Sequence, residues 1–347
     1  MSTSQPGGVE GVDRRGFMRR AVGVGAGAMT ILVADRQAAA APISFTYVTP
    51  FGFLIGYAPV LVAKAGGFFE QQGLDVTIYG GRGSAQAVQQ ILSGQALLSR
   101  AGGSDLIKAV ANQDAPIVSV GVVCQGSPFF MVSHQAKPIH GPKDMIGKSI
   151  GVVTRGGSVE NLLDTMLVND GLDPTKVERN VVGNAPGAFG LIEQGRIDGL
   201  IISVGSVVTL RMEGAPIVAW NTDEHAPVPG QVYVTSKEAT VKQPETIVKF
   251  LKAVLASMAS ISADRDGEKT LDLLKAFEIA EMKNPAIAKA GLFEEAKLWD
   301  SAGVQNRLRH LPEHWQHARD LLAQAKLVPA GPAMVCYTNE FVDRARA

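Results

Sequence analysis

The chain has 347 residues, of which 46% are hydrophobic and 19% are charged. This composition excludes an intrinsically disordered chain, and the length suits two lobes or one domain with a long tail. Lys and Arg total 33, as do Asp and Glu, so the chain lacks the basic excess usual in nucleic-acid-binding proteins. The balance is uneven along the chain: residues 1–41 hold five Arg and three acidic residues, and 42–347 carry a formal charge of −2.

The first 41 residues have the pattern of an export signal. Arg14-Arg15 precede Gly-Phe-Met, a 14-residue apolar run follows at 21–34, and Ala38–Ala41 supply small residues for cleavage near Ala40-Ala41. The Arg pair resembles the twin-arginine signal, which directs folded proteins to export. The apolar run is shorter than the roughly 20 residues that cross a bilayer. We therefore expect a periplasmic mature chain without a membrane span, starting near Pro42.

From residue 43 onward, strand-like apolar runs alternate with helical patterns, which predicts an α/β fold with mostly parallel strands. The first series of predicted elements is strand 43–48, helix 58–70, strand 75–79, helix 85–92, helix 106–112 and strand 117–123. The second series is strand 149–153, helix 159–169, strand 181–182, helix 188–194, strand 200–202, helix 206–213 and strand 217–220. Helical patterns at 245–261, 269–279, 296–302 and 312–326 complete the chain.

The two series indicate an internal repeat. Ala115-Pro116-Ile117-Val118 recurs as Ala215-Pro216-Ile217-Val218, and in each series a helix ends at Gly before an apolar strand and a Gly/Ser loop. Two similar lobes would enclose a cleft. We expect lobe 1 at 42–135, lobe 2 at 136–226, and a return crossover with C-terminal helices packing on both lobes at 227–347.

Three Gly-rich loops lie where a strand gives way to a helix. Ligands of parallel α/β sheets bind beyond the carboxyl ends of strands, and helix N-termini favour a negative group there. The loops lack the glycine and lysine spacing of nucleotide sites. Their Ser residues could instead be N-caps, and their Arg residues could be solvated or form inter-lobe salt bridges. The candidate ligand contacts in these loops are Arg82, Gly83, Ser84, Gly103, Ser104, Arg155, Gly157 and Ser158.

The cysteine and histidine residues do not predict a metal or catalytic site. Cys124 and Cys336 have no metal-ligand spacing, and either a disulfide or two buried thiols fits the expected compartment. His310, His314 and His317 do not form the His-Glu-x-x-His pattern, and we expect a solvated helix face. We predict no catalytic residue, metal or cofactor.

Several motifs resemble the nitrate/sulfonate/taurine and thiamine-pyrimidine-precursor solute-binding proteins of ABC importers. They are Gly56-Tyr57-Ala58-Pro59-Val60, Ala63–Val76, Gly141–Val152, Asp170–Pro174 and Glu193–Gly199. The resemblance covers roughly 43–260. It departs at Gly94-Gln95-Ala96-Leu97, where the family usually has Gly-x-x-Asp. It implies a two-lobed type II periplasmic binding protein fold, with a hinge of two crossover segments that encloses a ligand.

The same resemblance implies further pocket residues. Phe51, Phe53 and Tyr57 would form an aromatic wall, and the pocket loops would also include Gly52 and Ser203; Phe51 and Phe53 could instead be packing residues. We expect a monomeric substrate-binding protein that presents a small organic anion, a sulfonate or carboxylate, to an inner-membrane ABC permease. The alternatives are a pyrimidine-precursor-binding protein, an exported enzyme or a receptor-linked sensor on this scaffold.

Overall fold

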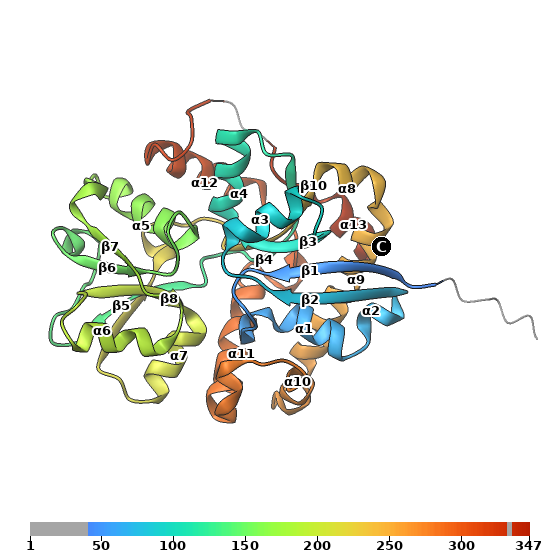
Figure 1. The fold of residues 1–347 in the computed structure, drawn as a ribbon, viewed down its shortest axis with the longest axis horizontal. Helices are drawn as coiled ribbons and strands as arrows, with labels where there is room; N and C mark the ends of the chain where they lie inside the picture. Colours follow the sequence, from blue (N-terminus) through green and yellow to red (C-terminus); the bar gives the residue numbers. More distant parts are fainter. Residues whose placement is uncertain (1–40, 332–334) are drawn as a thin grey trace, which may run out of the picture. The chain divides into compact units, whose positions relative to one another are not determined.

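The computed structural model describes residues 41–331 and 335–347, and residues 41–347 group as one compact unit. The predicted export signal lies outside the described residues. The unit contains two five-stranded mixed sheets, one in each lobe (Figure 1). The first sheet has the order β2 (Leu74–Gly80), β1 (Ile43–Thr49), β3 (Leu98–Gly102), β10 (Gln231–Ser236) and β4 (Ile117–Cys124). The second has the order β7 (Glu178–Val181), β6 (Ser149–Val152), β8 (Gly199–Ser203), β5 (Phe129–His134) and β9 (Ile217–Asn221).

The two sheets have the same construction, as expected for a repeated architecture. In each, three neighbouring strands are parallel and the fourth position is taken by an antiparallel strand that the chain enters from the other lobe. That strand is β10 in the first sheet and β5 in the second. The α/β fold with two lobes and two crossovers is therefore confirmed.

Helices cover both sheets. The first lobe carries α1 (Ala58–Ala65), α2 (Phe68–Gln71), α3 (Ser84–Leu92), α4 (Gly103–Gln113), α8 (Lys237–Lys242), α9 (Pro244–Ala263), α10 (Glu268–Leu274), α11 (Pro285–Trp299), α12 (Pro312–Gln324) and α13 (Glu340–Arg346). The second lobe carries α5 (Ser158–Asn169), α6 (Gly190–Glu193) and α7 (Val204–Met212). The helix expected at 58–70 is interrupted at Gly66 and Gly67, where Gly67 has a φ of 73°. Helix α11 begins well before the expected residue 296 because Asn284 caps it and Pro285 opens it.

The first lobe has an aromatic core under helix α9. Phe250 of α9 stacks on Tyr47 of β1 and on Phe69 of α2, with ring centroids 5.6 and 5.5 Å apart. By length and composition α9 would qualify as a membrane span, but its apolar face, including Phe250, Val254 and Met258, is buried in this core. Core packing accounts for its hydrophobicity.

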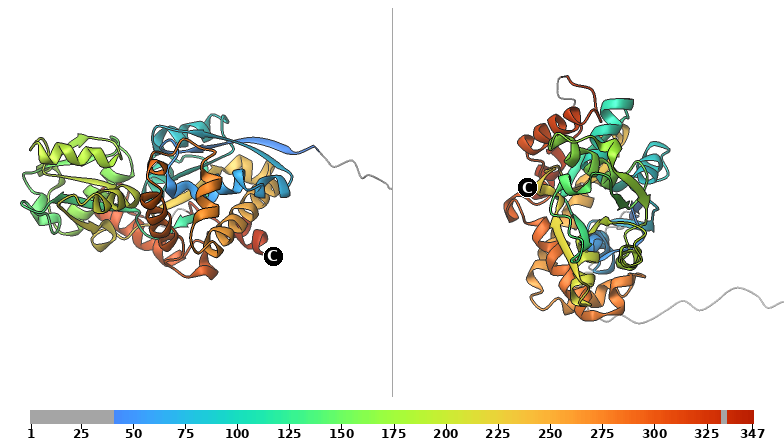
Figure 2. Two further views of the ribbon diagram at one scale, coloured as in Figure 1. Left: turned by 90° about the horizontal axis from the view of Figure 1, so that it is seen from below. Right: turned by 90° about the vertical axis from the view of Figure 1, so that its left-hand side faces the viewer.

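The lobes meet on two sides. Helix α4 of the first lobe packs against α5 of the second, and α12 contacts both; on the other side α7 packs against α11. In Figure 1 and the left panel of Figure 2, the second sheet and its helices lie to one side of the first sheet. The space between the two helix contacts is where the strand-end loops of both sheets converge.

Two crossover segments connect the lobes and are bonded to each other. The first is the stretch 125–128 between β4 and β5; the second is 222–230 between β9 and β10. Ser127 donates its backbone N–H to Asp223 at 2.8 Å, and Thr222 donates its hydroxyl to Ser127 Oγ at 2.7 Å. Because β5 belongs to the second sheet, the first crossover lies before β5 and not near residue 135, where we expected the lobe boundary.

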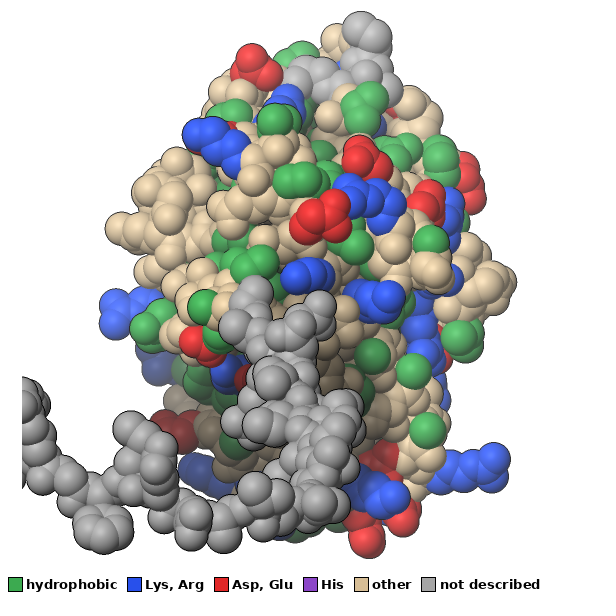
Figure 3. Space-filling view, turned by 90° about the vertical axis from the view of Figure 1, so that its right-hand side faces the viewer, with side chains coloured by type: hydrophobic (Ala, Val, Ile, Leu, Met, Phe, Trp, Pro, Cys, Tyr) green, Lys and Arg blue, Asp and Glu red, His purple; other side chains and the backbone are tan. Residues whose placement is uncertain are grey.

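Charges of both signs are distributed over the surface. Figure 3 shows one end of the molecule, where Lys and Arg side chains alternate with Asp and Glu side chains and with hydrophobic ones. The face shown therefore carries no large area of one sign of charge.

Candidate functional site

A cavity of about 600 Å³ lies between the two lobes. The first lobe lines it with Phe51, Gly52 and Arg82, and with residues of the segment between α10 and α11, including Glu281 and Lys283. The second lobe lines it with Thr154, Gly183–Pro186 and the α7 residues Ser206 and Thr209. A ligand held here would contact both lobes at once.

A second space, of about 30 Å³, forms the floor of the cleft and shares Phe51, Leu54, Asn184 and Glu281 with the larger cavity. This volume suits one water molecule or one small polar group. It is lined by charged and polar side chains that are largely buried, together with three aromatic rings. The remaining side chains facing the floor include Tyr57, Arg100, Phe129, Ser203, Gln231 and Glu295.

Arg100 is the buried cation of the floor. It lies in β3, is only 3% exposed, and its side chain is held by three acceptors. It donates to the backbone oxygen of Gly56 at 2.6 Å, to Gln231 Oε1 at 3.1 Å and to Cys124 Sγ at 3.5 Å. Its guanidinium also lies 4.9 Å from the centre of the Tyr57 ring. Arg100 is therefore fixed in orientation and solvated by the first lobe itself.

Glu295 and Glu281 are two carboxylates beside this cation. Glu295, in α11, is 4% exposed. Its Oε1 lies so close to Gly56 that a Cβ at Gly56 would be 2.6 Å from this oxygen. Oε2 of each carboxylate is buried and has no hydrogen-bond partner among residues 41–331 and 335–347. Burial raises the pKa of Glu295 to about 7, with Arg100 opposing and Glu281 adding to the shift, and burial also raises the pKa of Glu281.

The second lobe orders its side of the floor through Asn184. The Asn184 side chain accepts the backbone N–H of Ser203 at 2.8 Å and donates to the Ser203 hydroxyl at 2.9 Å. Ser206 in turn donates its hydroxyl to the backbone oxygen of Asn184 at 2.5 Å. These bonds fix the loop after β7 against the start of α7, so that this wall is pre-organised.

Five of the thirteen residues proposed from the sequence line these two spaces. They are Phe51, Gly52, Tyr57, Arg82 and Ser203. Phe51 lines both, whereas Phe53 lines neither and packs on Phe277 with ring centroids 5.4 Å apart. The packing alternative thus describes Phe53, while Phe51 faces the cleft.

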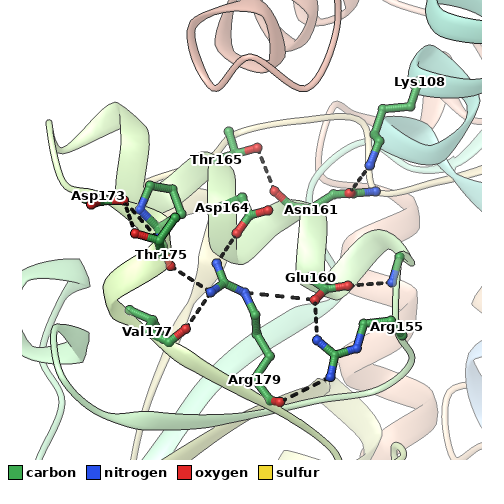
Figure 4. A network of polar contacts seen from close by, with 12 residues as sticks. Lys108, Arg155, Glu160, Asn161, Asp164, Thr165, Asp173, Thr175, Val177 and Arg179 are labelled. Atoms are coloured by element: carbon green, nitrogen blue, oxygen red, sulfur yellow. Dashed lines mark hydrogen bonds and ion pairs between the residues drawn. The ribbon is translucent and has the colours of Figure 1, made fainter.

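Arg155 points away from the cleft and into a network of the second lobe (Figure 4). Its guanidinium pairs with Glu160 at 3.4 Å and donates to the backbone oxygen of Arg179 at 3.5 Å. Arg179 pairs in turn with Asp164. Arg155 therefore stabilises the start of α5, and Arg82 is the loop arginine that lines the cleft.

The remaining loop residues form a direct contact between the lobes. Asp105 of α4 accepts the hydroxyl of Ser158 at 2.6 Å and the Asn161 side-chain amide at 2.8 Å. Gly102 approaches Ser158 so closely that a Cβ at this glycine would lie 2.1 Å from its hydroxyl oxygen. The Asp105 carboxylate therefore lies against Ser158, the first residue of α5. The sequence analysis expected an anionic group of the ligand at this position.

The N-cap alternative for the loop serines is wrong. The capping positions of α3, α4 and α5 are Gly83, Gly102 and Gly157, without a side-chain cap bond, and Ser84, Ser104 and Ser158 lie inside the first turn. Ser84, Gly103, Ser104, Gly157 and Ser158 are all buried and absent from the walls of the two spaces. Gly83 lies between the lobes, where a Cβ would contact Thr154 at 3.7 Å.

The sequence did not single out the charged and amide residues of the floor. Each carries only a weak local signal: Arg100 is a lone charge in a buried strand, and Glu295 lies four residues from both Gly291 and Trp299 on the buried face of α11. The bond between Arg100 and Gln231 joins positions 131 residues apart, so no local motif contains it. The residues missed by the sequence are Arg100, Asn184, Gln231, Glu281 and Glu295.

The cysteine and histidine residues have structural positions. Cys124 and Cys336 are buried free thiols, so the two-thiol alternative is confirmed. His314 and His317 are exposed on α12, as expected for a solvated helix face, whereas His310 lies before the helix, is buried, and its ring bonds with Ser119 at 2.7 Å. Among the described residues no group of three His, Cys, Asp or Glu side chains is arranged to hold a metal ion.

The chain is similar in sequence and in fold to known binding proteins. The chain is 24% identical to the riboflavin-binding protein RibY of Chloroflexus aurantiacus over 83% of both chains. It is 30% identical to a formylaminopyrimidine-binding protein of Halalkalibacterium halodurans over 56% of this chain and 59% of the relative. The alkanesulfonate-binding protein SsuA of Xanthomonas axonopodis pv. citri shares the fold, with a TM-score of 0.66, 18% identity, and coverage of 84% of this chain and 96% of SsuA. The family model described as NMT1/THI5 like matches residues 55–267, more than half of the chain, and the chain therefore belongs to this family.

Proposed function

We propose that the chain is the extracytoplasmic substrate-binding protein of an ABC importer, and that it captures a small organic ligand in the inter-lobe cleft. The observation that carries this proposal is the cavity of about 600 Å³ walled by Phe51 and Arg82 on one lobe and by Thr154 and Asn184 on the other. A ligand that bridges both walls stabilises the state in which the lobes meet. A permease can then distinguish the ligand-bound protein from the ligand-free protein by the positions of the lobes.

The first candidate ligand is an organic anion with an apolar or aromatic body. Arg82 and Lys283 are cations on the cavity wall, and Phe51 offers a ring for the ligand body. A sulfonate or carboxylate bound by Arg82 would gain a charge-assisted hydrogen bond. We further propose a monomer that is exported through its N-terminal segment, cleaved near Ala40-Ala41, and partnered with an inner-membrane permease.

The second candidate is a flat heterocycle. Two relatives are named for binding riboflavin and formylaminopyrimidine, and Phe51, Tyr57 and Phe129 give the cleft floor the aromatic surface that such rings require. An exported enzyme and a receptor-linked sensor remain alternatives: turnover of a bound compound would favour the enzyme. Co-purification with a receptor instead of a permease would favour the sensor.

A binding panel of sulfonates, aromatic carboxylates and pyrimidines tests the proposal. A ligand at 100 times its dissociation constant should stabilise the mature chain by about 2.7 kcal/mol, which thermal denaturation would detect. For an anionic hit, Arg82→Ala should weaken binding by about tenfold or more, as expected for a charge-assisted bond, measured by isothermal titration calorimetry.

Arg155→Ala is the matched control, because it removes an arginine from the equivalent loop of the other lobe but outside the cleft. It should leave affinity within about twofold, well below the effect of one charge-assisted hydrogen bond. Equal losses in the two variants, or no loss in either, would contradict the assignment of Arg82.

A further inference from the structure

The floor of the cleft holds more negative than positive charge. Glu281 and Glu295 face the 30 Å³ space together with one cation, Arg100, which donates three hydrogen bonds, to Gly56, Gln231 and Cys124. No ion pair within 4.0 Å joins Arg100 to either carboxylate among the described residues, although Arg100 lowers the pKa of Glu295 through space. The floor therefore presents acceptors that the protein itself leaves unfilled.

The unfilled acceptor of Glu295 is not at the protein surface. The side chain is 4% exposed, and its Oε2 is a buried oxygen without a partner. Leaving a buried polar group unpaired is costly, and charged groups cost more than neutral ones. A buried acceptor in the wall of a cleft that has no protein partner can be satisfied by a donor group of a ligand.

Glu281 connects the floor, where Glu295 lies, with the main cavity. It lines both the floor and the 600 Å³ cavity, and it faces the second lobe at Gly205, where a Cβ would lie 3.6 Å from Glu281 Oε1. Its Oε2 is also unpartnered. The two carboxylates thus extend from the main cavity into a space that accepts one small group.

We propose that Glu281 and Glu295 form a subsite for a nitrogen group of the ligand that donates N–H bonds, either a protonated amine or the amino group of an aromatic ring. This inference rests on the proposed binding function and specifies its ligand. The amino group fills the floor and satisfies the free carboxylate oxygens. An anionic group of the same ligand remains free to contact Arg82 in the wider cavity.

Matched probe pairs that differ by one amino group test the subsite. They are taurine against ethanesulfonate, para-aminobenzoate against benzoate, sulfanilate against benzenesulfonate, and aminopyrimidine against pyrimidine. The taurine arm reports on a cationic amine and the other arms on neutral amino groups. In at least one pair the amino compound should bind the wild-type chain about tenfold more tightly, as expected for hydrogen bonds to a charged acceptor.

Substitutions in the floor should remove this preference. Glu281→Gln and Glu295→Gln remove the charge, and Glu295→Met keeps a similar volume without an acceptor; each should reduce the preference to less than about threefold. Glu294→Gln is the matched control, since Glu294 is a partly exposed carboxylate of the same helix as Glu295 that pairs with Lys297 and lines neither space, and it should keep the preference. A preference retained in all floor variants overturns the proposal, as does equal or tighter wild-type binding of every compound without an amino group.

A ligand-free measurement separates this inference from the proposed function. Removing one of two carboxylates beside a single guanidinium balances the floor charges, so Glu295→Gln and Glu295→Met should raise the apo Tm at neutral pH by about 2 °C or more. A lower Tm in both variants would mean that the carboxylate is structural and would overturn the subsite. If no probe of any kind binds, the proposed ligand classes fail, and the Tm result alone decides the role of Glu295.

Discussion

Asp105 is a half-buried carboxylate and Glu295 a buried one, both where the lobes meet, and their surroundings differ. Asp105 receives hydrogen bonds from Ser158 and Asn161 of the other lobe, with Lys108 nearby. Glu295 keeps one oxygen without a partner and lies beside a cation that is bonded elsewhere. The two lobes therefore satisfy the Asp105 carboxylate between them, whereas no protein group of the described residues pairs with Oε2 of Glu295.

The largest predicted effect is on the satisfied carboxylate. Asp105→Ala removes the acceptor of two hydrogen bonds and leaves buried donors of Ser158 and Asn161 unpaired, so the free energy of unfolding should fall by about 3 kcal/mol. Denaturant-induced unfolding followed by circular dichroism would measure it. Asp105→Asn, which keeps one acceptor oxygen, should lose less; a loss below about 1 kcal/mol in the alanine variant would mean that the α4–α5 contact contributes little.

The next effect is the pH dependence of the unsatisfied carboxylate. Burial raises the pKa of Glu295 to about 7 from an ordinary value of 4.5, so between these pH values the folded chain holds a proton that the unfolded chain has lost. The stabilisation from this protonation is complete below pH 4.5 and is lost as the pH rises through 7. One pKa unit corresponds to about 1.4 kcal/mol, so the loss amounts to about 3 kcal/mol at most.

Glu295→Gln should remove this part of the pH dependence, because the amide does not titrate in this range. Unfolding free energies measured at several pH values between 4 and 9 would compare the two proteins. Wild-type and variant curves that run parallel over the whole range would show that the Glu295 carboxyl titrates in the folded chain as it does in the unfolded chain.

The smallest predicted effect compares two aromatic residues two positions apart. Phe51 faces both cavities, and Phe53 packs on Phe277. Phe51→Ala should weaken ligand binding about tenfold, corresponding to about 1.4 kcal/mol, with little change in stability. Phe53→Ala should show the reverse, a stability loss of about 1–2 kcal/mol with affinity retained. Calorimetric titration and thermal unfolding of both variants would test this. A loss of affinity in the Phe53 variant with stability loss in the Phe51 variant would contradict the assignment.

The fold could be predicted from the sequence because each predicted lobe alternates strands and helices in the same order. The two strands it did not reveal, β5 and β10, are the ones that enter each sheet from the other lobe. Their antiparallel positions depend on long-range pairing, such as Phe129 with Ser203, and not on a local pattern. The start of α11 was missed although Asn284 and Pro285 mark it locally, because the buried face of the helix includes Gly291 and Glu295 and so lacks a continuous apolar pattern.

Only part of the candidate site could be predicted from the sequence. Loop chemistry pointed to Arg82 and the family resemblance pointed to Phe51, and both residues line the cavity between the lobes. Loop chemistry could not distinguish Arg82 from Arg155, since both follow a strand and precede a helix. That distinction depends on Glu160, which binds Arg155 in the folded lobe. The floor combines β3, β10 and α11, and its charges become neighbours only through tertiary packing.

The bonded pair of crossovers has a mechanical consequence. Ser127 and Thr222 join the two connecting segments side by side, and a Cβ at Gly230 would collide with the Gly126 backbone oxygen at 1.9 Å. Because the two segments are hydrogen-bonded to each other and lie in close contact, a change in backbone direction at one crossover has to be matched at the other. The two connections between the lobes therefore act as one unit.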